Sequence, residues 1–363
     1  MPHSNRVHNF SAGPATLPLE VLEKAREELT DYRGKGASIM EMSHRSPEYS
    51  AIQEEATNRL KSLVGAGEGW NVLFLGGGAS TQFLMAPYNF LNGSRTVDYI
   101  NTGAWSTKAI KEAKPFGTVN VSYTGEEGGF IHIPERDELN LSKDATYLHF
   151  TSNNTIFGTQ FQKEPDSNGA PLVCDASSDF LSRPIDIDRY GLIYAGAQKN
   201  LGPSGVTVVL VHDSLLSKTR EESIPTILRY RTHVEKLFHT PPVYGVYLVN
   251  YVLEWLEGKG GLKSMETLNQ KKADLLYGEI DSDDFYRGTA EVSSRSLMNV
   301  TFRLQSEELE AAFLREAAKE DLVALKGHRS VGGIRASIYN ACRLESVEAL
   351  TNFMQRFRRS NTK

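Results

Sequence analysis

The segment Leu192-Ile-Tyr-Ala-Gly-Ala-Gln-Lys-Asn-Leu-Gly-Pro-Ser-Gly205 joins an apolar run to a lysine that is surrounded by small residues. The apolar run predicts a buried strand, and Lys199 follows it directly. A lysine held close to the backbone at the end of a buried strand loses hydration, which disfavours its charged form and makes its amine a better nucleophile. The segment indicates an amine suited to attack an aldehyde, although a solvated lysine at a strand end is the common alternative.

A second apolar run, Leu172-Val-Cys-Asp175, ends in an acid one strand and one crossover before Lys199. This spacing suits two neighbouring parallel strands, whose carboxyl ends meet at one edge of a sheet. A carboxylate there can pair with a protonated pyridine nitrogen and keep such a ring an acceptor of electrons. Either residue alone has an ordinary explanation, and the pair of strand ends is the stronger signal.

Apolar runs rich in Val and Ile recur along the first two thirds of the chain, and each is followed by a turn or a helix signal. They lie at 72–75, 97–100, 119–123, 147–150, 172–174, 192–195 and 206–211. Such runs are typical of a mostly parallel sheet with helices on both faces. We therefore predict an α/β fold whose ligand lies outside the carboxyl ends of the strands.

Helix signals flank these runs, and the pattern changes near residue 258. One helix is expected to begin at Pro18 and end at Gly34, and another to be capped by Ser46 and end at Gly65. Further helices are expected at 243–257, 261–280, 306–318 and the C-terminus, with strands at 297–304, 322–326 and 334–338. We predict an N-terminal arm (1–15) that contributes to the small domain and the active site, a large α/β domain (16–258) and a small C-terminal α+β domain (259–363).

A glycine turn after the first strand, Gly76-Gly-Gly-Ala-Ser80, leads into a helix. Free backbone N–H groups and the positive end of the helix would face one point there, which suits a phosphate. The turn matches neither the P-loop nor the full dinucleotide fingerprint. Trp105 follows the next strand and could stack on a cofactor ring, although tryptophan is more often a core or interface residue.

The composition excludes several classes of protein. The 363-residue chain has a formal net charge of −5, with 40% apolar and 23% charged residues, as expected of a soluble globular enzyme. It lacks the excess of basic residues that binding to nucleic acid or to an anionic membrane requires. We also find no apolar stretch of the length expected for a signal peptide or a membrane span. Its two cysteines, Cys174 and Cys342, and the absence of Cys-x-x-Cys or His-x-x-x-His spacing argue against a disulfide framework and a metal site. We expect a cytoplasmic, metal-free enzyme.

The motifs, in this order, resemble the phosphoserine aminotransferase family, whose members are fold-type I enzymes that use pyridoxal 5′-phosphate. The resemblance is carried by Phe10-Ser-Ala-Gly-Pro14, Met42-Ser-His-Arg45, Gly76-Gly-Gly78, Asn101-Thr-Gly-Ala-Trp105, Asp175-Ala-Ser-Ser, Gln198-Lys-Asn-Leu-Gly-Pro203, Thr240-Pro-Pro242, Gly327-His-Arg329 and Gly333-Ile-Arg-Ala-Ser-Ile-Tyr-Asn340. It covers nearly the whole chain, and the set is specific although its members are not. It implies a homodimer with the active sites shared between the subunits.

The resemblance also implies a role for each site residue. Lys199 and Asp175 would be catalytic, with Lys199 bound covalently to the cofactor and Asp175 on its pyridine nitrogen. The other cofactor-binding residues would be Trp105 on the ring, Thr155 near the ring hydroxyl, and a phosphate-binding set of Ala79, Ser80 and Gln198, with His239 and Thr240 of the partner subunit.

Substrate binding has a separate physical argument. The tripeptide His-Arg-Ser occurs twice, at 44–46 and 328–330, in a protein that is acidic overall, and the first copy directly precedes a helix start. The planar fork of Arg335 matches the two oxygens of a carboxylate. In the family, the position of Arg335 binds the substrate α-carboxylate. The positions of His44, Arg45, His328 and Arg329 receive the phosphate or the side-chain carboxylate of glutamate.

The implied reaction is a ping-pong transfer of the amino group of L-glutamate to 3-phosphohydroxypyruvate, which gives O-phospho-L-serine and 2-oxoglutarate in serine biosynthesis. Three residues depart from the family pattern. Ala12 replaces a frequent Ser, and His239 replaces a usual Asn. Asn154 lies in the tripeptide Asn153-Asn-Thr155, where Asn-Glu-Thr is familiar. His239 leaves the detailed phosphate contact open, although an imidazole can still donate a hydrogen bond.

Three other interpretations stay open from the residues alone. The chain could be another fold-type I aminotransferase. A cysteine desulfurase of the same fold would need a reactive thiol on a mobile loop, which leaves only Cys342, since Cys174 is expected to be buried. A cofactor-free protein that binds phosphate ligands could use the glycine turn and the basic residues, but it would leave the pairing of Asp175 and Lys199 unexplained.

Overall fold

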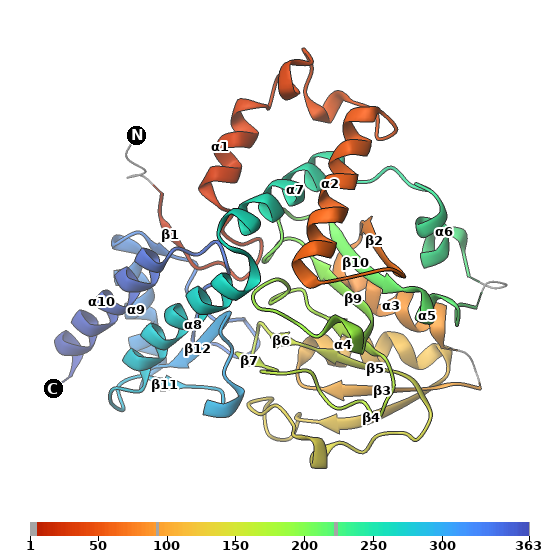
Figure 1. Ribbon diagram of the computed structural model, residues 1–363. Coiled ribbons are helices and arrows are strands. Elements are labelled where there is room, and N and C mark those ends of the chain that lie inside the picture. The colour runs from red at the N-terminus through yellow and green to blue at the C-terminus, as the bar shows by residue number, and fades with distance from the viewer. Residues whose placement is uncertain (1–5, 92–93, 221–223, 363) are drawn as a thin grey trace.

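A seven-stranded sheet forms the centre of the computed structural model, which describes residues 6–91, 94–220 and 224–362 (Figure 1). The strand order is β2-β10-β9-β8-β5-β3-β4. The strands are β2 (Trp70–Leu75), β3 (Thr96–Asn101), β4 (Thr118–Thr124), β5 (Ala145–Thr151), β8 (Leu172–Asp175), β9 (Tyr190–Gly196) and β10 (Thr207–His212). β10 pairs antiparallel with both of its neighbours, and the other pairs are parallel. The predicted mostly parallel α/β sheet is confirmed.

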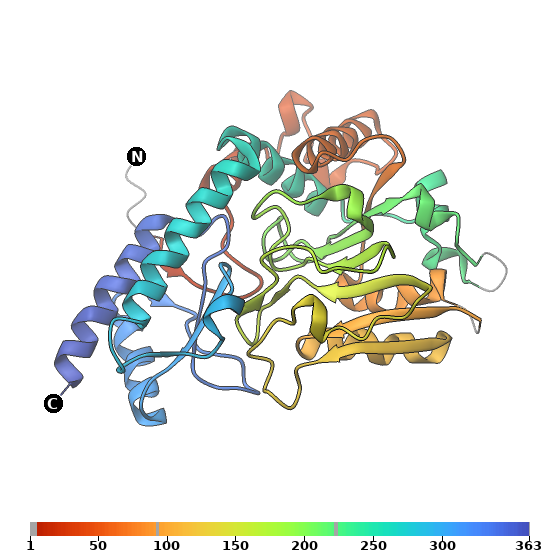
Figure 2. The ribbon, with the colours of Figure 1, turned by 60° about the horizontal axis from the view of Figure 1, so that its bottom comes forward.

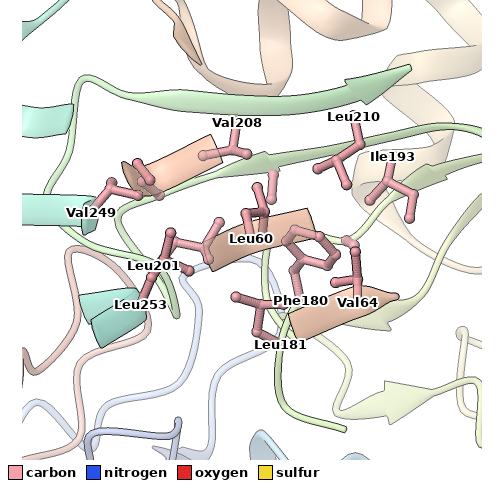
Figure 3. Packing of buried hydrophobic residues seen from close by; sticks show 14 of the residues in the cluster. Leu60, Val64, Phe180, Leu181, Ile193, Leu201, Val208, Leu210, Val249 and Leu253 are labelled. Carbon is pink, nitrogen blue, oxygen red and sulfur yellow. The ribbon is translucent and has the colours of Figure 1, made fainter. Parts of the chain in front are cut away.

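Helices cover both faces of this sheet because neighbouring residues of each buried strand point to opposite sides. Ile193 and Val208 pack into the cluster that contains residues of α2 (Pro47–Val64) and α7 (Val243–Gly258). Leu192 and Val209 pack on the other face, with residues of α3 (Gly78–Phe90) and α4 (Ala104–Ala113). Figure 3 shows the first cluster, in which side chains of α2 and α7 meet those of β9 and β10. Burial of each such side chain contributes roughly 1.5–3 kcal/mol.

The helix signals predicted one N-terminal helix correctly and overextended the other. α2 begins at Pro47, its cap Ser46 accepts a hydrogen bond from the Tyr49 N–H at 3.3 Å, and Gly65 ends it in the left-handed conformation. By contrast, α1 (Leu19–Glu27) ends well before Gly34, so the predicted end is wrong. The chain instead forms a separate 3₁₀ turn, Tyr32–Gly34, in which the buried Tyr32 packs edge-on against Tyr247 of α7 with 5.9 Å between ring centroids. Tertiary packing overrides the helical periodicity there.

A second unit of packed elements follows α7 and lies at one end of the sheet (Figures 1 and 2). Its strands β11 (Arg287–Gly288), β12 (Asn299–Arg303) and β14 (Ile334–Ser337) form an antiparallel sheet. Its helices are α8 (Gly261–Ile280), α9 (Glu307–Lys319) and α10 (Leu344–Asn361). Phe302, Phe313 and Phe353 belong to its own hydrophobic cluster. The predicted helices and strands of this region agree with the structure to within a few residues; the domain boundaries at 15 and 258 stay predictions.

The N-terminal segment pairs with this second unit rather than with the large sheet. β1 (His8–Asn9) lies parallel to β13 (Leu322–Val323), and Phe10 is buried in the C-terminal cluster. The segment then runs to the loop after β9, where the Ala15 N–H donates to the Gln198 carbonyl at 2.8 Å. The shorter elements are β6 (Asn153–Asn154), β7 (Thr159–Gln160), α5 (Asp213–Leu216) and α6 (Tyr230–Glu235). Over the ranges described, no helix has both the length and the apolar character needed to cross a bilayer.

Candidate active site

Lys199 lies in the turn that follows β9, and its amine contacts a single hydroxyl. Its Nζ donates a hydrogen bond to Thr155 Oγ1 at 2.8 Å. Burial lowers the pKa of Lys199 to about 8, the Asp175 carboxylate opposes that change, and the Arg335 guanidinium adds to it. A larger fraction of the amine is therefore unprotonated near neutral pH than in an ordinary lysine. Gly13 of the N-terminal segment lies beside this side chain, where a Cβ would be 3.4 Å from Lys199 Cγ, an ordinary contact distance.

Asp175 lies at the end of β8, on the strand beside the one that leads to Lys199. Its Oδ1 accepts two hydrogen bonds from Ser177, one from the backbone N–H at 3.0 Å and one from Oγ at 2.6 Å. Ser177 Oγ in turn accepts from the Gly196 N–H at 3.1 Å, so it links the two strand ends. Burial raises the pKa of the Asp175 carboxyl, while Lys199 and the Ser177 bonds oppose that rise.

Ser177 contacts the candidate site through Asp175, and the sequence did not predict this contact. It belongs to the motif Asp175-Ala-Ser-Ser, which carried the family resemblance, but no role was assigned to the serines. A small hydroxyl residue two positions after a strand-end acid is the signal that was available, because such side chains commonly hydrogen-bond to nearby backbone and carboxylate groups.

Trp105 is the second residue of α4, and its ring lies near the lysine amine. Lys199 Nζ is 5.7 Å from the centroid of the ring, and the indole Nε1 is buried without a hydrogen-bond partner among the described residues. Gly103, just before α4, lies against Asn154, since a Cβ at Gly103 would be 2.7 Å from Asn154 Oδ1. The glycine therefore lets the chain bring Trp105 close to the loop that holds Thr155.

The glycine turn forms the start of α3, as the sequence predicted. Gly77 has a φ of +87°, and a Cβ there would lie 1.9 Å from Thr81 Oγ1, so glycine is required at this position. Ala79 and Ser80 lie in the first turn, where backbone N–H groups have no partner within the helix, and Ser80 is exposed. Such a turn suits an anion.

Arg335, on β14, brings the C-terminal unit to the same loop. Its Nη1 donates to the Thr155 carbonyl at 3.2 Å, and burial lowers the pKa of its guanidinium. Tyr339, which no prediction included, donates from its hydroxyl to the Ala12 carbonyl at 2.9 Å and accepts from Asn299 Nδ2 at 3.1 Å. Residues from both units and from the N-terminal segment therefore meet around Thr155 and Lys199.

His328 and Arg329 lie in the loop that leads to β14. His328 Nδ1 lies 2.7 Å from Ser330 Oγ. Burial lowers the pKa of His328, and the positive charges of Arg335, Arg329 and Lys108 lower it further. These basic groups together make the surroundings of His328 electropositive.

Four further predicted site residues lie in the segments that precede α2 and α7. His44 and Arg45 precede α2, and His239 and Thr240 precede α7. Burial lowers the pKa of His239, and so do the nearby His233 and His44. Both ring nitrogens of His239 are buried without a hydrogen-bond partner among the described residues. No hydrogen bond, ion pair or ring contact within those residues joins these four to Lys199, and their roles stay predictions.

Neither cysteine thiol is suited to act as a nucleophile at this site. Cys174 and Cys342 are both free and buried, and burial raises the pKa of each. A buried thiol with a raised pKa is a poor nucleophile, which disfavours a cysteine desulfurase. Within the described ranges, no group of three or more His, Cys, Asp or Glu side chains is arranged to hold a metal ion.

Comparison with known proteins shows which family this chain resembles. Residues 7–350 match the family Aminotransferase class-V. The phosphoserine aminotransferase of Niallia circulans is 54% identical over 98% of this chain and 99% of its own. A solved phosphoserine aminotransferase from Bacillus circulans subsp. alkalophilus has a TM-score of 0.96 at 53% identity, covering 99% of this chain and 100% of that one. A PLP-bound phosphoserine aminotransferase from Trichomonas vaginalis has a TM-score of 0.92 at 41% identity, over 96% and 100%. The chain therefore belongs to the class-V aminotransferases and, among them, to the phosphoserine aminotransferase family.

Proposed function

We propose that this protein transfers the amino group of L-glutamate to 3-phosphohydroxypyruvate, with pyridoxal 5′-phosphate bound at Lys199. The products are 2-oxoglutarate and O-phospho-L-serine. The proposal rests most on one observation: the Lys199 amine and the Arg335 guanidinium of the second unit hydrogen-bond to the same residue, Thr155, and Lys199 follows the strand that pairs with the one ending in Asp175.

The side chains around Lys199 suit this cofactor. Asp175 Oδ1 is occupied by Ser177, whereas Oδ2 has no hydrogen-bond partner among the described residues and can accept from a pyridine nitrogen. Trp105 offers an aromatic face. The first turn of α3, with Ala79 and Ser80, suits the phosphate of the cofactor. We assign Gln198, which precedes Lys199 in the sequence, to the same phosphate. When bound, the cofactor accepts the electron pair left on the substrate α-carbon after its proton departs.

The protein residues then bind, orient and move a proton. Arg335 holds the α-carboxylate with its planar fork, which turns the α-C–H bond toward Lys199. The Lys199 amine would take the α-proton of the bound substrate as a base and later give a proton back as an acid. The Asp175 carboxylate would hold the protonated pyridine nitrogen of the cofactor.

The remaining site residues bind the distal anion and complete the site in a homodimer. His328 and Arg329 bind the phosphate of one substrate or the side-chain carboxylate of the other. We assign His44, Arg45, His239 and Thr240 to the site of the partner subunit, because none contacts Lys199 within one chain. The lowered pKa keeps His239 neutral, so one of its two ring nitrogens carries a proton that it can donate to the cofactor phosphate. Two buried free thiols suit the reducing conditions of the cytoplasm, where we place the enzyme.

Amino transfer from glutamate to 3-phosphohydroxypyruvate, followed by chromatography of O-phospho-L-serine, tests the proposal. Turnover should require pyridoxal phosphate and should be lost in Lys199→Ala together with the visible absorbance of the bound cofactor. The longer phosphorylated keto acid of vitamin B6 synthesis serves as a second acceptor. Purified protein that carries the cofactor but leaves 3-phosphohydroxypyruvate unchanged would contradict the proposal.

A further inference from the structure

Lys108 is a basic residue of α4 that no prediction included, and it stacks on Trp105. The two residues are three apart on one helix, so their side chains share a face. Lys108 Nζ lies 4.4 Å from the centroid of the Trp105 ring, and Lys199 Nζ lies 5.7 Å from the same centroid. Lys108 is exposed, whereas Lys199 is partly buried. One indole therefore lies close to the catalytic amine and to a second ammonium group that is open to solvent.

The basic loop before β14 belongs to the C-terminal unit and carries His328 and Arg329. The positive charge of Lys108 is one of those that lower the pKa of His328, together with the charges of Arg335 and Arg329. The position of Lys108 over Trp105, whose ring also lies near the Lys199 amine, places it beside the same active site.

These basic residues carry an excess of positive charge. Among the residues that the structure describes, Lys108, Arg329 and Arg335 form no ion pair with a carboxylate, in a chain of net charge −5 whose other basic residues form many. Like charges gathered in this way repel each other. The arrangement is best balanced by a ligand with more than one negative charge.

We propose that Lys108 is a specificity-determining residue of the phosphate subsite, where its ammonium group contacts the phosphate of 3-phosphohydroxypyruvate and of phosphoserine and favours it over the side-chain carboxylate of glutamate. This inference deepens the proposed function and rests on it. A phosphate monoester carries about −1.5 to −2 charges near neutral pH, whereas a carboxylate carries one. A lysine acts as a point charge on a flexible stem, which suits a large anion that needs no bidentate fit.

Three variants separate charge from packing. Lys108→Met keeps the stem over Trp105 and removes the charge, and Lys108→Arg keeps a charge. Lys111→Met removes a charge from an exposed position one turn further along α4 and controls for net charge. Each holoenzyme is mixed with phosphoserine or with glutamate in a stopped-flow spectrometer to obtain the apparent dissociation constant of each amino donor. The inhibition constant of inorganic phosphate is measured separately.

Lys108→Met should raise the dissociation constant of phosphoserine and the inhibition constant of phosphate about tenfold, the effect of one charge-assisted hydrogen bond at a solvated site. The constant for glutamate should rise only about three- to fivefold, because the Coulomb energy with Lys108 is proportional to the charge of the ligand. Lys108→Arg and Lys111→Met should resemble the wild type for both donors.

Two results would overturn the inference. Equal weakening of phosphoserine and glutamate in Lys108→Met would mean that Lys108 only supports Trp105, and unchanged constants would mean that it plays no part in binding. A wild-type enzyme that forms no phosphoserine would contradict the proposed function instead, whatever the variants do. An unaltered spectrum of bound cofactor in Lys108→Met confirms that the variant is folded.

Discussion

Lys199 and Arg335 hydrogen-bond to the same residue, Thr155, although one follows a strand of the large sheet and the other lies on a strand of the C-terminal unit. The Thr155 hydroxyl accepts from Lys199 Nζ at 2.8 Å, and its carbonyl accepts from Arg335 Nη1 at 3.2 Å. A single residue therefore relates the position of the amine to the position of the carboxylate-binding group.

Thr155 variants test this relationship. Thr155→Val removes the hydroxyl but keeps the carbonyl that Arg335 uses, so kcat should fall about 10- to 100-fold, as for the loss of a hydrogen bond to a charged group. The KM for glutamate should change little, and Thr155→Ser should restore kcat. Steady-state kinetics of the three proteins provide the measurement. A Thr155→Val enzyme with raised KM and normal kcat would show that Thr155 serves binding alone.

The lowered pKa of Lys199 predicts how cofactor uptake depends on pH. The unprotonated amine attacks the aldehyde, so the rate at which cofactor-free protein captures pyridoxal phosphate should rise with pH and level off above a pH of about 8, where Lys199 has lost its proton. An ordinary lysine would level off only above roughly 10.4. Asp175→Asn removes the charge that opposes this shift, so its midpoint should be lower still. A rate that keeps rising past pH 10 would contradict the assignment.

Much of this arrangement was predictable from local sequence, because strand-end residues of adjacent parallel strands must meet. The order of the apolar runs placed Asp175 and Lys199 on neighbouring strands, and β8 and β9 do pair in parallel. The cap Ser46, Pro47 and Gly65 fixed both ends of α2. Local signals could not predict that α1 ends at Glu27, or that Tyr32 packs against the distant Tyr247. They also could not predict the link from Ser177 to Gly196, which depends on strand register.

The positions of the basic residues were less predictable, since they depend on long-range packing. The two His-Arg-Ser copies look alike in sequence, yet the charge of Arg335 lowers the pKa of His328 in one copy, whereas His44 of the other copy contributes to the lowered pKa of His239. Pairing of β1 with β13 likewise joins the N-terminal segment to the C-terminal unit. Strands of two residues are too short to show a periodic pattern in the sequence. Lys108 carried no signal beyond being one of many exposed lysines.

Gly77 is expected to be essential for the turn that begins α3. Gly77→Ala would place a Cβ 1.9 Å from Thr81 Oγ1 in a left-handed conformation, so it should lower the free energy of unfolding by about 1–3 kcal/mol and weaken cofactor binding. Gly67→Ala is a matched control, because no atom lies within 4 Å of its built Cβ, and it should change stability by less than about 0.5 kcal/mol. Urea unfolding and cofactor titration measure both effects, and equal behaviour of the two variants would refute the requirement.

Lys272 is expected to stabilise the turn after β14. It is fully buried and donates to the carbonyls of Ile338, Tyr339 and Cys342 at 2.8, 2.7 and 3.2 Å. Lys272→Met would leave these carbonyls without that donor, so the protein should lose about 2–4 kcal/mol of stability. Its exposed neighbour provides the control variant Lys271→Met, which should unfold like the wild type. Chemical denaturation followed by circular dichroism would reveal the difference, and an unchanged midpoint for Lys272→Met would contradict this role.

The most direct test of the whole account is to locate the covalent bond between the protein and its cofactor. Reduction of the yellow holoenzyme with borohydride, followed by proteolysis and mass spectrometry, should find the reduced cofactor on the peptide that contains Lys199 and on no other lysine. Attachment at a different lysine, or a protein that takes up no cofactor, would contradict the account.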